Sequence, residues 1–153
     1  MGAARRMMDN GQEISGRKVW ITMSEHPDCA LVRRGYTAFA AGDMNTLSEL
    51  ITADAVYHVP GDNILSGHHK GRDAILELFR RMGEETAGTM QIQLEAVLAD
   101  GRGHVMSFHT ARADRGDRGI EIRQGLFFRI VGGKVTDIDE CVEDIEEENT
   151  FWR

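Results

Sequence analysis

The spacing of apolar residues differs between the two halves of this chain, and this difference limits the folds it can adopt. Residues 31–42 and 75–82 carry apolar side chains at helical spacing, on one face of each segment. Residues 90–98 instead alternate between apolar and polar side chains, and similar stretches follow at 104–113, 120–130 and 135–142. Helices that precede a run of strands favour an α+β fold, with the helices covering one face of a curved antiparallel sheet.

Local signals place the ends of the helices. Pro27 and Asp28 suit the first turn of a helix that ends at Gly42. Asp43 is suited to cap a second helix with a buried apolar side, and a third helix begins at Arg72.

A short buried strand is predicted at Ala55–Val59, between the second and third helices, and Pro60-Gly61 ends it. Residues 60–71 are rich in Gly, Asn, Asp and Ser, so we expect a surface loop there. The strand is of interest because it places one ionisable side chain, His58, within an apolar segment.

The length of 153 residues indicates one domain. Residues 1–24 are polar and lack a sustained period, so we expect an N-terminal extension followed by a single domain at 25–153. Met23 is an alternative start to Met1. The two cysteines form no recognisable disulfide framework, which favours a reducing cytoplasm.

The net charge of −7 is concentrated near the C-terminus. Eight acidic residues and no Lys or Arg lie between 137 and 148, so the rest of the chain has 17 acidic against 18 basic residues. We expect residues 143–148 to be a solvated tail, with Phe151-Trp152 anchoring the end of the chain. This balance argues against a nucleic-acid partner, and no apolar run of about 20 residues indicates a membrane span.

Several short segments occur in one order over residues 28–152. They are Tyr36–Asp43, Ala53–Ala55, His58–Gly61, Ser66-Gly67, Gly71–Asp73, Thr86–Thr89, Gly133–Val135, Asp144 and Phe151-Trp152. In this order and spacing they resemble SnoaL-like proteins, which share the nuclear transport factor 2-like fold with ketosteroid isomerases and polyketide cyclases. The resemblance implies a cone in which three N-terminal helices pack on a strongly curved, mostly antiparallel sheet around one apolar pocket. It also implies homodimers formed through the outer face of the sheet.

The chain departs from the ketosteroid isomerases at their catalytic positions. Val59 stands where those enzymes have an aspartate base before the proline, and Gly35 stands near their catalytic tyrosine, one residue from Tyr36. The position of their second acid falls near Arg123 or Gln124. We therefore do not expect ketosteroid isomerase activity.

Three residues are candidates for acid–base chemistry. One interpretation of His58 is functional, as a general base or as a hydrogen-bond donor to a ligand. The alternative is a core histidine bonded to a backbone carbonyl. Gln124 interrupts an apolar strand face, and its amide must bond either a ligand, a water or a neighbouring side chain. Glu140 shares a strand face with Ile138 and Val142, so it is either a carboxyl group with a raised pKa or a solvated side chain at the rim.

Five further residues are candidates for ligand contact. Instead of contacting a ligand, Tyr36 could pack within the core, and His109 could lie on the outer face of the sheet that forms dimers. The aromatic rings are expected either to line the pocket or to fill it. The five are Tyr36, Phe39, Phe79, His109 and Phe128.

No metal or cofactor is expected. Adjacent His68-His69 on a loop do not share a helix face, and the glycines at 61, 67 and 71 fit no dinucleotide or phosphate-loop spacing. The sequence thus supports a pocket for an apolar small molecule, with isomerase, cyclase or hydratase chemistry on a carbonyl-bearing substrate as one hypothesis. The other is a non-catalytic ligand-binding or dimeric interaction domain.

Overall fold

The computed structural model describes residues 25–153, which form four helices and one six-stranded sheet. The helices are α1 (Pro27–Ala40), α2 (Met44–Leu50), α3 (Arg72–Glu85) and α4 (Ile145–Trp152). The strands are β1 (Ile51–Val59), β2 (Gly67–Lys70), β3 (Gln91–Ala99), β4 (His104–Arg115), β5 (Arg118–Val131) and β6 (Lys134–Val142). The predicted extension at 1–24 and the alternative start at Met23 lie outside the described residues.

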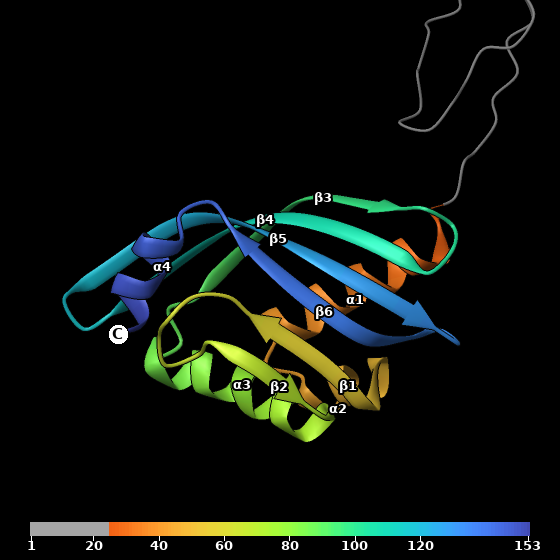
Figure 1. Ribbon diagram of the computed structural model, residues 1–153, viewed down its shortest axis with the longest axis horizontal. Helices are drawn as coiled ribbons and strands as arrows, with labels where there is room; N and C mark the ends of the chain where they lie inside the picture. The colour runs from red at the N-terminus through yellow and green to blue at the C-terminus, as the bar shows by residue number, and fades with distance from the viewer. Residues whose placement is uncertain (1–24) are drawn as a thin grey trace, which may run out of the picture.

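The sheet is mixed and strongly bent. Its strand order is β2-β1-β6-β5-β4-β3, and β1 runs parallel to β6 while all other neighbours are antiparallel. Register shifts in β3 near Glu95 and in β5 near Arg129 mark bulges, which increase the local twist and bend of a strand. Figure 1 shows α1, α2 and α3 on the concave side of the sheet and α4 at one end. The α+β class and the curved sheet are confirmed.

Three expectations about elements are wrong. The helices are four rather than three N-terminal ones, because α3 follows two strands and α4 ends the chain. The expected loop at 60–71 contains β2, which pairs with β1 through partners such as His58 and His68. The acidic segment is exposed at residues 143–147 as expected, but it is not a tail, because α4 begins at Ile145 and Glu148 is buried.

The ends of the helices follow the predicted signals. Asp43 caps α2 by accepting a hydrogen bond from the Thr46 backbone N–H at 3.0 Å, and Gly42 before it has φ +65°. Asp144 caps α4 in the same way, accepting from the N–H groups of Glu146 and Glu147 at 3.0 Å each. Carboxylates in a first turn interact favourably with the helix dipole, which explains why so acidic a segment is helical.

Phe151 and Trp152 anchor the end of the chain as predicted, with exposed fractions of 3% and 4%. They pack into the main core together with apolar residues of α1, α3 and all strands except β2 and β3. No helix within residues 25–153 is long and apolar enough to cross a membrane.

Arg115, at the end of β4, fastens α4 to the rest of the fold. Its guanidinium donates to the carbonyl oxygens of Phe151 at 3.1 Å and Arg153 at 2.8 Å, and it pairs with Glu85 of α3 at 2.9 Å. Arg118 also donates to the carbonyl of Arg153. A cation at these free carbonyls stabilises the C-terminal end of the helix.

We expect Arg115→Gln to lower the free energy of unfolding by about 2 kcal/mol, because it removes charge-assisted hydrogen bonds to α4 and α3. The measurement is urea denaturation followed by tryptophan fluorescence. Arg112→Gln is the matched control, since Arg112 forms an exposed pair with Glu121 on the same sheet and should change stability little. Equal effects of the two substitutions would contradict this role for Arg115.

Candidate active site

An apolar cavity of about 120 Å³ lies between the concave face of the sheet and the helices. Most of its wall is aliphatic or aromatic, contributed by α1, α2, α3 and the inner faces of β1, β4, β5 and β6. Its polar wall consists of Tyr36, Tyr57, His109, Gln124, Glu140, Glu148 and Trp152. Within the described part of the chain, no Lys or Arg lines it.

Strand alternation and register bring these polar side chains together. His109 on β4 and Gln124 on β5 are direct cross-strand partners, and Glu140 on β6 is the partner of Leu126, two residues further along β5. Residues two apart on a strand share a face, so all three side chains meet on the concave side. Tyr36 enters from α1 and Glu148 from α4.

The polar side chains form one continuous hydrogen-bond chain. The Tyr36 hydroxyl lies 2.7 Å from both Ser107 Oγ and His109 Nδ1. His109 Nε2 lies 2.8 Å from Gln124 Oε1. Because an amide oxygen only accepts, Nε2 of His109 carries the proton and Nδ1 accepts from Tyr36.

The amide nitrogen of Gln124 continues the chain to two carboxyl groups. It donates to Glu148 Oε1 at 2.9 Å and to Glu140 Oε1 at 3.4 Å. This network assigns the orientation of the amide, because only its NH₂ group can donate to both carboxylates. Tyr57 donates to Glu140 Oε2 at 2.7 Å, and Trp152 Nε1 donates to Glu148 Oε1 at 3.1 Å.

Glu140 is the group best suited to exchange a proton near neutral pH. Burial raises the pKa of its carboxyl to about 7, the hydrogen bond from Tyr57 opposes that rise, and the charge of Glu148 adds to it. A carboxyl with this pKa is ionised and protonated in comparable amounts at neutral pH, as a general acid–base group requires.

Burial also shifts the pKa values of the other titratable groups of the wall. Burial raises the pKa of Glu148, against the hydrogen bond from Trp152. Burial also raises the pKa of the Tyr36 and Tyr57 hydroxyls, so both remain donors, and it lowers the pKa of His109, so the imidazole stays uncharged.

Seven of the eight residues proposed from the sequence line this cavity. Four of them belong to its polar wall, so the outward alternative for His109 and the rim alternative for Glu140 are wrong: Glu140, Gln124, Tyr36 and His109. The remaining three line it with aromatic rings: Phe39, Phe79 and Phe128.

His58 does not line the cavity, so the expectation that it faces the pocket is wrong. Its neighbours Tyr57 and Val59 point inward, and strand alternation therefore turns His58 to the outer face. There its ring centroid lies 4.5 Å from that of His68, and its Nδ1 lies 3.8 Å from Asp139 Oδ1. Within the described residues, its ring has no hydrogen bond to the backbone and does not line the cavity. We therefore assign it no part in the chemistry.

Three polar wall residues were missed in the sequence. Tyr57 lies two residues before Val59 on β1, so the two side chains share the inward face. The apolar Val59 could therefore have identified Tyr57 as inward-facing. Glu148 and Trp152 lie on α4, where the density of acidic residues suggested a solvated segment. Glu148 precedes Trp152 by four residues, a helical spacing that places both on one face.

No group of three or more metal-ligating side chains occurs in residues 25–153. The chemistry available to the site's own residues is proton transfer and hydrogen bonding within an apolar enclosure.

Stability should depend on pH through Glu140. Its pKa is about 7 in the folded protein against 4.5 ordinarily, so the folded state holds this proton more tightly and loses stability as pH rises from 4.5 through 7. We expect the stability of Glu140→Gln relative to the parent protein to increase by about 3 kcal/mol between pH 5 and pH 8.

The measurement is urea denaturation of both proteins across this pH range. Glu121→Gln is the control, because Glu121 is an exposed carboxylate on the opposite face of β5 and its hydrogen bond with Arg112 lowers its pKa. A difference between Glu140→Gln and the parent that stays constant with pH would contradict a raised pKa at Glu140.

Comparison with known proteins identifies the family. Residues 32–138 match the SnoaL-like domain. Uncharacterized protein Rv0034 of Mycobacterium tuberculosis is 31% identical over 85% of this chain and 99% of its own length. Bal32a, from a soil-derived mobile gene cassette, is 39% identical with a TM-score of 0.81, covering 83% of this chain and 97% of that one.

A putative polyketide cyclase from Xanthomonas campestris shares the fold at 17% identity, with a TM-score of 0.65 over 83% of this chain and 97% of that one. The matched region contains the predicted motifs from α1 to β6 and most of the cavity wall. The chain therefore belongs to the SnoaL-like domain family, on the nuclear transport factor 2-like fold.

Proposed function

We propose that this protein is a general acid–base enzyme that acts on an apolar, carbonyl-bearing small molecule, by isomerisation or cyclisation. The observation that carries the proposal is the continuous chain of hydrogen bonds from Tyr36 to Glu140 and Glu148 within an otherwise apolar cavity. Membership of the SnoaL-like family and the shared fold with a putative polyketide cyclase are consistent with it.

Glu140 is the proton-transfer group in this proposal. Its carboxylate takes a proton from the carbon next to the substrate carbonyl, and the electrons of that C–H bond move to the carbonyl oxygen to form an enolate. The cavity hydroxyl groups are Tyr36, which donates to His109, and Tyr57, which donates to Glu140, and either would donate to this oxygen by turning from its present partner. When the enolate is conjugated with a C=C bond, return of the proton from Glu140 to the far carbon of that bond completes an isomerisation.

The apolar wall contributes in two ways. It excludes water from the enolate, which strengthens each hydrogen bond to it. It also limits the substrate, because a cavity of about 120 Å³ accommodates one ring or a compact pair of fused rings.

Exchange of the α-protons of 2-indanone in D₂O tests this proposal without knowledge of the natural substrate. We expect the protein to accelerate the exchange, with a rate that rises with pH and levels off above about pH 7, because Glu140 must be ionised. Glu140→Gln should lower the protein-catalysed rate at least about 100-fold. Proton NMR follows the decrease of the α-proton signal of 2-indanone as deuterium replaces these protons.

His58→Gln is the matched control, since this histidine lies on the outer face and should leave the exchange rate unchanged. Tyr57→Phe should move the midpoint of the pH profile upward, because the Tyr57 hydroxyl lowers the pKa of Glu140. No acceleration by the parent protein, or equal rates for the parent and Glu140→Gln, would refute the proposed chemistry on this class of ketone.

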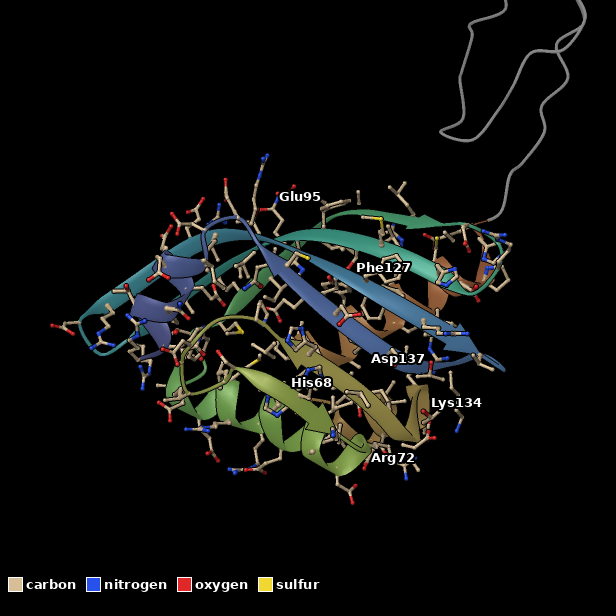
Figure 2. All side chains as sticks on the ribbon, in the orientation of Figure 1. His68, Arg72, Glu95, Phe127, Lys134 and Asp137 are labelled. Carbon is tan, nitrogen blue, oxygen red and sulfur yellow. The ribbon has the colours of Figure 1, made fainter. Side chains whose placement is uncertain are left out.

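The outer face of the sheet supports a second proposal, that the protein forms homodimers. Large apolar side chains lie exposed there in directly opposed positions on three strands, with Leu98 paired to Met106 and Met106 paired to Phe127. Phe108 lies beside them, and Figure 2 labels Phe127 on β5. Contiguous exposed apolar side chains are typical of protein interfaces, and a second copy presents the same surface.

We expect the parent protein to be a dimer by light scattering after size-exclusion chromatography, and Phe127→Lys to shift it to a monomer. A lysine in this patch places an uncompensated charge in the interface. Ile145→Lys, a change at an exposed apolar residue of α4, should leave the dimer intact. A monomeric parent protein at micromolar concentration would contradict the proposal.

A further inference from the structure

We propose that Glu148 determines which ligands this cavity accepts, by binding an O–H or N–H group that the ligand carries beside its carbonyl. The inference builds on the proposed function and narrows its substrate class. It rests on the position of Glu148, on the hydrogen bonds of its two oxygens, and on the composition of the cavity wall.

The two oxygens of Glu148 differ in their hydrogen bonds. Oε1 accepts from Gln124 at 2.9 Å and from Trp152 at 3.1 Å. Oε2 is buried and has no hydrogen-bond partner in the part of the chain that the structure describes. The residue is only 4% exposed and lines the cavity. A buried carboxyl oxygen without a partner destabilises the protein, and a ligand donor would remove that penalty.

Only one other buried side-chain atom in residues 25–153 lacks a partner, Thr52 Oγ1, and Thr52 does not line the cavity. The other cavity carboxyl, Glu140, already has a partner for each oxygen. Among the residues that line the cavity, the carboxyl oxygen without a partner is therefore at Glu148.

The rest of the wall offers no competing partner for this oxygen. His109 and Gln124 are joined to each other, and no Lys or Arg within the described residues faces the cavity. The fold also holds Glu148 in place, because α4 is fastened through Arg115 at its C-terminal end and capped by Asp144 at its start. An acceptor held rigidly inside an apolar enclosure selects strongly for a donor.

Three compounds of nearly the same shape test whether the cavity prefers a ligand with a hydrogen-bond donor. Indole carries an N–H donor, indene carries a CH₂ group in its place, and 2-indanone carries an acceptor only. We expect indole to bind the parent protein about tenfold or more tightly than indene, because it donates to a buried carboxyl group. Affinities are measured by calorimetric titration or by NMR shift perturbation of the cavity residues.

Glu148→Gln should abolish this preference. Gln124 and Trp152 both donate to the Oε1 position, so the amide oxygen of the variant must occupy it and the NH₂ group takes the place of Oε2. The variant then presents a donor in place of an acceptor. It should lose the preference for indole over indene and bind 2-indanone more tightly than the parent protein does.

Glu147→Gln is the control, because Glu147 lies on the same helix with an exposed side chain, and it should keep the parent preference. Equal affinity of indole and indene for the parent protein would overturn the inference without any variant being needed. Survival of the indole preference in Glu148→Gln would overturn it as well.

The α-proton exchange of 2-indanone by the parent protein separates this inference from the proposed function. Exchange without an indole preference would refute the role of Glu148 alone. An indole preference without exchange would refute the proposed chemistry and leave the ligand class in place.

Discussion

The amide group of Gln124 holds the polar end of the cavity together, because its two ends bond side chains from three other elements and reach a fourth through His109. Its oxygen accepts from His109, which bonds Tyr36 of α1, and its nitrogen donates to Glu140 of β6 and Glu148 of α4. Two carboxyl groups placed this close together repel each other when both are charged, and a shared donor between them reduces that cost. An amide suits this position since it offers an acceptor and a double donor in one plane.

The network satisfies the buried polar groups of the wall and leaves Glu140 able to exchange a proton near neutral pH. Every polar side chain of the wall has a partner, apart from one oxygen of Glu148, so the apolar enclosure survives the burial of seven polar groups. The neutral imidazole and the two protonated tyrosines carry no charge that would neutralise Glu140. Its proton is therefore held by burial and by the neighbouring acid, both of which keep it near the point of release at neutral pH.

Much of the fold was predictable, because helical spacing, caps and strand alternation are local signals. The inward faces of β5 and β6 were likewise set by alternation, and they identified Gln124 and Glu140. His58 shows where this reasoning fails: a strand with apolar residues on both faces does not reveal which face is the core, and the core face here is the one that packs against α3, where Tyr57 contacts Phe79. Glu148 was missed for a related reason, since α4 is defined by a cap and by tertiary contacts rather than by apolar spacing.

The parallel pairing of β1 with β6 affects the order in which the parts of this fold can assemble. It joins a strand from the first part of the domain to the last strand, and the hydrogen bond from Tyr57 to Glu140 spans 83 residues of sequence. Contacts this distant in sequence form late and slow the folding of a chain. Until β6 and α4 join the earlier elements, β1 is paired with β2 alone and the cavity lacks Glu140, Glu148 and Trp152, so the pocket is completed only when the last two elements are in place.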